Sequence, residues 1–117
     1  MDVVYGCIII DDILRLNRRD AGRLPSYHFS PFDRERLVQD NLTHMGAIAH
    51  RRGLPEARFD ETLREMGDWD LLVRLTREKA PLALPAVACF YSTSAPDRLS
   101  GGATFEADMA RVRAKAR

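Results

Sequence analysis

The chain has 117 residues, of which 45% are hydrophobic and 30% are charged, and its formal net charge is +1. This length suits one domain over residues 1 to 117 with a core of its own, and the charge gives no reason to expect a nucleic-acid partner. No apolar run approaches the roughly 18 residues that cross a bilayer. Cys7 and Cys89 lie inside apolar runs, which predicts reduced, buried thiols in a cytoplasmic protein.

A strand, a loop and a short helix are predicted in turn along the first part of the chain. Val3 to Ile10 is rich in β-branched residues and predicts a buried strand. Asn17 to Arg23 is polar and turn-like, and Leu24 to Phe32 predicts a loop interrupted by prolines. Asp33 suits the N-cap of a short helix from Arg34 to Asn41. For the aromatic residues of the loop we expect places in the core: Tyr27, Phe29 and Phe32.

The rest of the chain is predicted to alternate strands and helices. The expected elements are a strand from Thr43 to His50, a helical stretch from Phe59 to Gly67, a helix from Asp68 to Lys79, a strand from Leu84 to Tyr91, a loop from Ser92 to Gly102 and a polar helix from Thr104 to Arg117. Phe105, Met109 and Val112 share one face of the last helix. This alternation indicates an α/β fold with a mixed sheet flanked by helices.

The helix that begins at Asp68 is amphipathic, and its two aspartates are predicted to face opposite ways. At about 100° per residue, Asp68 falls within the buried arc at the first turn. Asp70 falls on the solvated face, where an i,i+4 pair with Arg74 contributes about 0.2–0.5 kcal/mol. The two carboxylates therefore cannot share one metal ion, and no metal site is predicted. The buried arc consists of Trp69, Leu71, Leu72, Val73 and Leu75.

Two roles suit Asp68, and they are compatible with each other. Aspartate is a preferred N-cap residue, and helix physics alone favours this structural role. A capping carboxylate can also face a cleft, where it can accept a proton from a reacting group.

A series of short motifs runs through much of the chain. They are Val3-Val4-Tyr5-Gly6, Asn41-Leu42-Thr43, Met45 to Ala49, His50-Arg51-Arg52, Arg58-Phe59-Asp60-Glu61-Thr62-Leu63, Met66-Gly67-Asp68-Trp69-Asp70-Leu71, Leu84-Pro85-Ala86-Val87 and Phe90-Tyr91. At this spacing, the Phe-Asp-Glu and Asp-Trp-Asp-Leu motifs together resemble the inverting glycosyltransferases of family 2, which have a GT-A fold. The chain departs from that family at Gly67, where the family often has glutamate.

The resemblance implies a fold, a reaction and a base. It implies a partial GT-A fold in which Asp68 takes the proton from an acceptor hydroxyl while that oxygen attacks the anomeric carbon of a nucleotide sugar, with inversion. The family's metal-binding aspartates should precede the Val3 strand, where only Met1 and Asp2 stand. We therefore expect a C-terminal, acceptor-side portion that is inactive by itself. The divalent metal, Mn²⁺ or Mg²⁺, is expected for the full-length enzyme and no cofactor for this chain alone.

Other residues are weaker candidates for contact with substrate. His50, Arg51, Arg52 and Trp69 lie close to the family motifs, and arginine binds phosphate well. For His50 a polar strand end, and for the two arginines a solvated loop, are the simpler roles. The basic C-terminal helix end suits either solvent or the anionic surface of a membrane, where the family often works: Arg111, Arg113, Lys115 and Arg117.

Two further functions stay open. One is a non-catalytic fragment or small interaction domain of the same ancestry. The other is a receiver-like signalling domain, for which Asp11 and Asp12 would form an acidic pocket; such a domain also needs a lysine at a strand end, and Lys79 is predicted at a helix end. If the nucleotide-binding half is missing, the Val3 strand becomes a sheet edge, which predicts a homodimer through residues 3 to 10.

Overall fold

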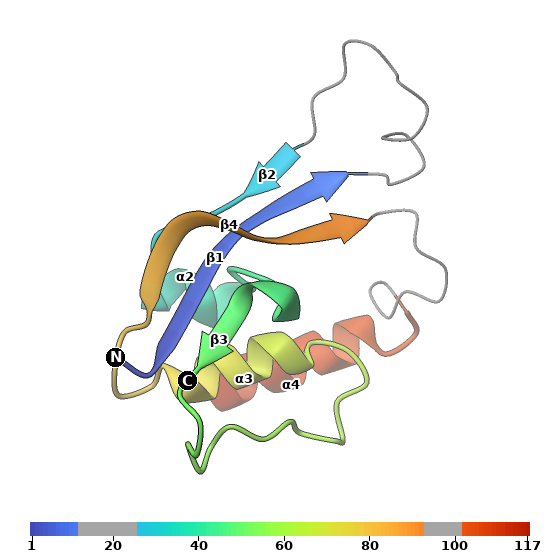
Figure 1. Ribbon diagram of the computed structural model, residues 1–117. Coiled ribbons are helices and arrows are strands. Elements are labelled where there is room, and N and C mark those ends of the chain that lie inside the picture. The colour runs from blue at the N-terminus through green and yellow to red at the C-terminus, as the bar shows by residue number, and fades with distance from the viewer. Residues whose placement is uncertain (12–25, 93–101) are drawn as a thin grey trace.

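The computed structural model describes residues 1–11, 26–92 and 102–117. These residues form a mixed α/β fold in which a four-stranded sheet is combined with helices (Figure 1). In chain order the elements are β1 (Val3–Asp11), β2 (Ser26–His28), α2 (Arg34–Gln39), the 3₁₀-helix η1 (Met45–Ala47), β3 (Ile48–His50), α3 (Gly67–Leu75), β4 (Leu82–Ser92) and α4 (Phe105–Ala116).

β1 is the central strand of the sheet. It pairs antiparallel with β2 and β3 and parallel with β4. Ile9 lies between Tyr27 of β2 and Phe90 of β4, and Val4 lies between β3 and β4 in the same way. The expectation that residues 3 to 10 form an open edge is therefore wrong, because β1 has partners on both sides. The homodimer itself stays a prediction.

β1 and β4 approach each other very closely at Gly6. The register between the two strands shifts on either side of Cys7, which marks a bulge in the pairing. A Cβ atom on Gly6 would lie 2.7 Å from the Cβ of Ala88 and 2.9 Å from the carbonyl oxygen of Ala86. Only glycine fits this position without moving β4.

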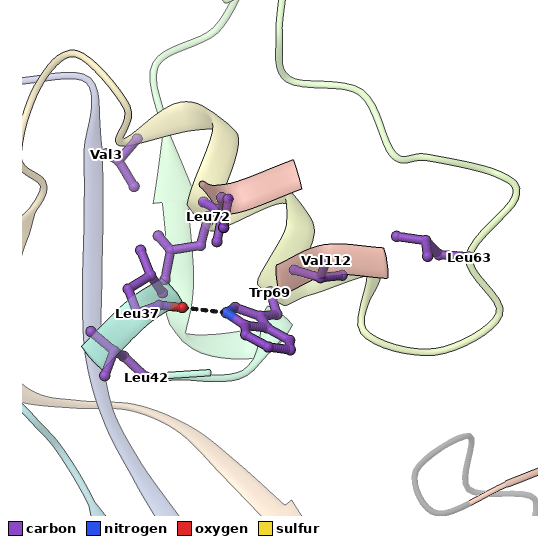
Figure 2. Close-up of a cluster of buried hydrophobic side chains, with 9 residues drawn as sticks. Val3, Leu37, Leu42, Leu63, Trp69, Leu72 and Val112 are labelled. Atoms are coloured by element: carbon purple, nitrogen blue, oxygen red, sulfur yellow. Dashed lines mark hydrogen bonds between the residues drawn. The ribbon is translucent and has the colours of Figure 1, made fainter. Parts of the chain in front are cut away.

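Helices α2, α3 and α4 lie together on one side of the sheet (Figure 1). Their apolar side chains enclose a core with Val3 of β1 at its sheet end (Figure 2). At the centre Trp69 is fully buried and donates its indole N–H to the carbonyl oxygen of Leu37 at 2.7 Å. The core consists of Val3, Leu37, Leu42, Leu63, Trp69, Leu72, Val73, Val112 and Ala116.

The starts of α2 and α3 differ in their capping. Asp33 caps α2 as predicted, since its Oδ1 accepts the backbone N–H groups of Glu35 and Arg36 at 2.9 and 3.2 Å. Asp68 does not cap α3. The cap position belongs to Met66, a non-glycine residue with a positive φ of 60°, and Asp68 lies inside the first turn.

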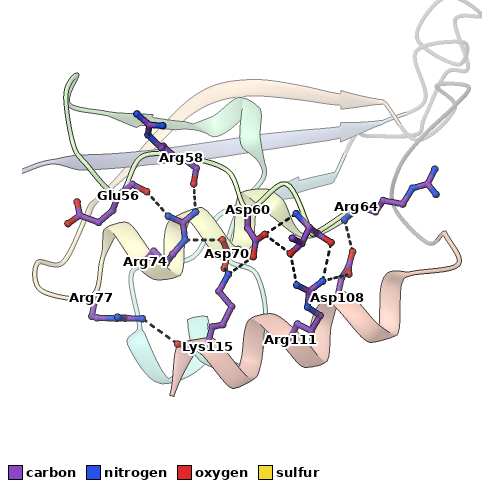
Figure 3. Close-up of polar contacts among 11 residues, drawn as sticks. Glu56, Arg58, Asp60, Arg64, Asp70, Arg74, Arg77, Asp108, Arg111 and Lys115 are labelled. Atoms are coloured by element: carbon purple, nitrogen blue, oxygen red, sulfur yellow. Dashed lines mark hydrogen bonds and ion pairs between the residues drawn. The ribbon is translucent and has the colours of Figure 1, made fainter.

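The burial of Asp70 is the main difference between the structure and the helical-wheel prediction. Its side chain is fully buried instead of solvated, and it lies between two cations (Figure 3). Oδ2 accepts the Nε–H of Arg74 at 2.9 Å, as the i,i+4 pairing predicted, and Oδ1 lies 2.5 Å from Nζ of Lys115. Lys115 also contacts Oδ2 of Asp60 at 2.9 Å. A buried carboxylate is stable only with such partners.

One stripe of α4 holds the segment before α3 in place (Figure 3). Asp108 accepts the backbone N–H groups of Arg64 and Glu65 at 3.0 and 2.8 Å. One turn later, Arg111 donates to the carbonyl and hydroxyl oxygens of Thr62. Lys115 completes the stripe through Asp60, because residues 108, 111 and 115 share one helix face.

Several predicted elements are confirmed and others are shorter or different. The strands from Val3 and Leu84 and the helices from Arg34 and Thr104 are present with small changes at their ends. The predicted strand from Thr43 is a 3₁₀-helix and a short strand, the predicted loop from Leu24 contains β2, and the stretch from Phe59 forms turns. The helix expected to reach Lys79 ends at Leu75. The turn from Asn17 to Arg23 and most of the loop from Ser92 to Gly102 lie outside the described residues.

Three basic residues of the last helix, Arg111, Arg113 and Lys115, make contacts within the chain, whereas Arg117 is exposed. Arg113 donates to the carbonyl oxygen of Gln39 at 2.9 Å and lies 5.9 Å from the ring centre of Trp69. Arg111 and Lys115 make the contacts above. Within the described ranges, no helix is long and apolar enough to cross a membrane.

Candidate functional site

A cleft of about 810 Å³ opens beside the first turn of α3. Its walls come from the loop before η1, the segment from Phe59 to Met66, the end of β4 at Tyr91 and the start of α4 at Phe105. These segments are distant in sequence, and the docking of α3 and α4 on the core brings them together.

Asp68 stands on the wall of this cleft. Its Oδ1 accepts the backbone N–H of Trp69 at 2.8 Å, which fixes the orientation of the carboxylate. Its Oδ2 lies 4.0 Å from Nδ1 of His44, and the Asp68 side chain is 20% exposed. A partly exposed carboxylate that is held in one orientation is a suitable proton acceptor.

His44 is held on its other side by an aromatic ring. It stacks on Tyr91 with ring centres 4.6 Å apart and an interplanar angle of 12°. Tyr91 ends β4, His44 precedes η1 and Asp68 begins α3, so the three side chains come from separate elements. Together they form a carboxylate–imidazole–phenol row along the cleft wall.

Two other carboxylates of the cleft, Asp60 and Glu65, have structural partners. Glu65 is buried and accepts the backbone N–H of Gly102 at 2.7 Å and the hydroxyl of Thr104 at 3.0 Å. Asp60 accepts hydrogen bonds from Thr62 and Lys115, which hold the pKa of that carboxyl well below its usual value. Asp60 and Glu65 therefore stabilise the wall, whereas Asp68 is oriented toward the cleft.

Apolar side chains line much of the remaining wall. Phe59 is a large, exposed hydrophobic residue. A Cβ atom added to Gly67 would lie 3.6 Å from the Cδ1 atom of Phe59. Phe59 therefore sits over the start of α3, close to Asp68. Met66 also lines the cleft in its left-handed backbone conformation, a strained state that costs about 1–3 kcal/mol and is enriched at functional sites.

None of the weaker candidates lines the cleft with Asp68, although Trp69 contacts it through its backbone N–H. The side chain of Trp69 is buried in the core, where its indole N–H donates a hydrogen bond to the carbonyl oxygen of Leu37. His50 is exposed at the end of β3, Arg51 lies 3.2 Å from Asp2, and Arg52 occupies an exposed turn. Of the predicted site residues, Asp68 is the one that lines the cleft of the described chain. A role in substrate binding for the others stays a prediction.

Metal-binding groups are not clustered in the described part of the chain, where no group of three or more His, Cys, Asp or Glu side chains could hold an ion. Asp70 is engaged by Arg74 and Lys115, so it cannot hold an ion together with Asp68. The divalent metal expected for the full-length enzyme stays a prediction. The receiver-like alternative also gains no support. Lys79 lies 3.5 Å from Asp2, and Asp12 is outside the described residues.

Sequence reasoning missed the association of His44 with Tyr91 and Asp68. His44 lies inside the strand predicted from Thr43 to His50, and its two neighbours lie on other elements. The one local signal was the aromatic end of the strand at Phe90-Tyr91, which the glycosyltransferase resemblance includes. Comparison of the chain with known proteins found no matching family model, no matching curated protein and no matching solved structure.

Proposed function

We propose that this chain forms the acceptor-side part of an inverting glycosyltransferase with a GT-A fold, and that Asp68 is its catalytic base. The observation that carries the proposal is the position of Asp68, partly exposed and oriented on the wall of a cleft large enough for a sugar-sized acceptor. The mixed sheet with helices on one side is compatible with such a fold.

In the proposed reaction the acceptor hydroxyl lies against Oδ2 of Asp68. The carboxylate takes the hydroxyl proton as the oxygen attacks the anomeric carbon, and the nucleotide diphosphate leaves from the opposite side of that carbon. His44, 4.0 Å from Oδ2, is placed to orient the carboxylate or the acceptor. Phe59 offers an exposed ring on which the apolar face of a sugar can rest. The nucleotide sugar would be held by residues outside this sequence.

The proposal can be tested on the chain as it exists by NMR. Methyl glycosides of glucose, galactose, mannose and N-acetylglucosamine should shift the amide signals of His44, Gly67 and Asp68 at millimolar concentration. Phe59→Ala should weaken this binding at least about tenfold, since it removes a stacking surface. Glu61→Gln, a change to an exposed carboxylate of the same cleft, is the matched control and should bind as the parent chain does.

Catalysis is tested in an enzyme that contains the chain together with a nucleotide-binding half. Asp68→Asn should lower turnover at least about a hundredfold, the scale for a lost general base. Glu61→Gln should leave turnover within a factor of about three. If no glycoside shifts the cleft amides, or if the two variants lose equal activity while folded, the assignment of Asp68 is wrong.

A small interaction domain is the second candidate function. It is favoured by the exposed apolar side chains on the strands, which have no role in the proposed reaction. If this function is correct, Asp68→Asn would not change partner binding, and the exposed sheet would be the binding surface.

A further inference from the structure

The sheet exposes many large apolar side chains. Tyr27 of β2 is 74% exposed, and β4 carries Val87 at 67% and Phe90 at 51%. Leu82 and Leu84 of β4 are also exposed. These residues lie on two strands on opposite sides of β1, so their exposure is a property of the sheet and not of one strand.

The pairing places Tyr27 and Phe90 on one face. Ile9 is directly opposite Tyr27 on one side and Phe90 on the other, and paired residues point to the same face of a sheet. The neighbouring row points the other way, because Ile8 is fully buried and Cys89 would lie 3.1 Å from a Cβ on Gly46 of η1. The row of Tyr27, Ile9 and Phe90 therefore points away from η1.

A second row of residues also points away from the buried side of the sheet, at the other end of β1. Val4 is opposite Ala49 of β3 and Leu82 of β4, both of which are exposed. Val3 and Tyr5 on either side of it are buried. Val4 and Ile9 are an odd number of residues apart, and the change of side between them coincides with the register shifts around Cys7.

These two rows define the open sheet face, which consists of Tyr27, Ile9, Phe90, Ala49, Val4 and Leu82. Helices α2, α3 and α4 all lie on the opposite side of the sheet (Figure 1), and none of the described residues forms a helix over the open sheet face. Strands of parallel pairs with both faces covered have continuous apolar sequences. β1 and β4 have such sequences, Val-Val-Tyr-Gly-Cys-Ile-Ile-Ile and Leu-Ala-Leu-Pro-Ala-Val-Ala-Cys-Phe-Tyr, so a second layer is expected.

Charge and area favour a second copy of the chain as that layer. None of the six residues that define the open sheet face is charged, so these side chains can meet those of a second copy without like-charge repulsion, and the net charge of +1 gives little repulsion at a distance. With 11 residues, β4 is about 36 Å long, and the strands are about 4.8 Å apart. The face thus offers on the order of 500 Å² per copy, or about 1,000 Å² in total, which is the lower limit for a specific interface.

We propose that two copies of the chain pack their open sheet faces against each other about a two-fold axis. The arrangement is a sheet-on-sheet dimer with Tyr27 and Phe90 buried between the copies. Because its area is small, the dissociation constant is expected to be on the order of micromolar. The interface does not use the cleft, so this proposal is independent of the proposed function.

Sedimentation equilibrium from about 1 to 500 μM tests the proposal. The parent chain should dimerise, and Tyr27→Lys and Phe90→Lys should each weaken dimerisation at least about tenfold, since each places a charge in an apolar interface twice. Phe59→Lys is the matched control, because Phe59 is an exposed aromatic residue of the cleft, away from the sheet, and its dimer should be as stable as that of the parent chain. Circular dichroism shows whether each variant is folded.

Tyr27 also distinguishes face packing from edge pairing. β2 and β4 flank β1 on opposite sides, so a dimer formed by adding a strand to the free side of β4 would lose stability with Phe90→Lys and not with Tyr27→Lys. That result would overturn the proposal. A monomer at every concentration would also overturn it, and would mean that the face is covered by another polypeptide or by nothing. Where Phe90→Lys fails to fold, Leu82→Ser supplies the β4 variant, because Leu82 also belongs to the open sheet face.

Discussion

Replacing Lys115 with methionine should destabilise the fold strongly, although the side chain lies near the end of the chain. The ammonium group lies 2.5 Å from the fully buried Asp70 and 2.9 Å from Asp60. Breaking a buried pair by removing one partner costs about 3–5 kcal/mol. Arg74 remains beside Asp70, and Lys115 is 36% exposed, so solvent screens part of the interaction.

We therefore expect a loss of about 2–3 kcal/mol in the free energy of unfolding. For a domain of this size that corresponds to a fall of roughly 8–12 °C in Tm. Urea and thermal denaturation followed by circular dichroism measure both quantities. Lys79→Met is the matched control, because Lys79 is 65% exposed and pairs with Asp2 at 3.5 Å; it should change stability by no more than about 0.5 kcal/mol. Equal effects of the two substitutions would refute the reasoning.

Two further outcomes follow from the same contacts. Gly6→Ala should destabilise the fold by about 1–3 kcal/mol, because the new Cβ would lie 2.7 Å from a β4 side chain. Gly67→Ala should be close to neutral, because its Cβ would make an ordinary van der Waals contact at 3.6 Å. Denaturation in urea measures both changes. Stability should also fall at both ends of the pH range. The depressed pKa of Asp60 adds stability above about pH 4 that is lost as the pH falls, since the unfolded carboxyl takes up its proton at higher pH than the folded one. Partial burial lowers the pKa of Lys115, but hydrogen bonds to Asp70 and Asp60 raise it overall. The stability that Lys115 contributes to the fold is therefore fully present below about pH 10 and is lost at higher pH. Urea midpoints from pH 2 to 11 should show both losses, and both should shrink in the Lys115→Met variant.

Local signals in the sequence were enough for the main strands and two helices. The continuous apolar runs predicted β1 and β4, and Asp33 predicted the start of α2. β2 was missed because it has only three residues and depends on pairing with β1. The strand predicted from Thr43 failed for a similar reason, since its first half turns into η1 to pass beneath Cys89.

The side of a helix that a charged residue faces depends on distant partners. A helical wheel assigns Asp70 to solvent from its neighbours on α3, but Lys115 of α4 supplies the cation that allows burial. Tyr27 was expected in the core, yet its pairing with Ile9 turns it outward. The sequence allowed Asp68 to cap its helix, to face a cleft, or both; it lines a cleft and does not cap α3. The association with His44 and Tyr91 depends on the tertiary arrangement.

The stripe of Asp108, Arg111 and Lys115 also makes the cleft dependent on the last helix. The segment from Asp60 to Glu65 has no regular secondary structure, and α4 holds it through both backbone and side-chain bonds. When α4 detaches, this wall loses its hydrogen-bond partners at the same time. The wall and α4 therefore open as one cooperative unit, and the amides of Arg64 and Glu65 should exchange with solvent at the rate of the α4 amides rather than at the rate of a loop. Any ligand that binds the cleft would then stabilise a helix near the far end of the sequence.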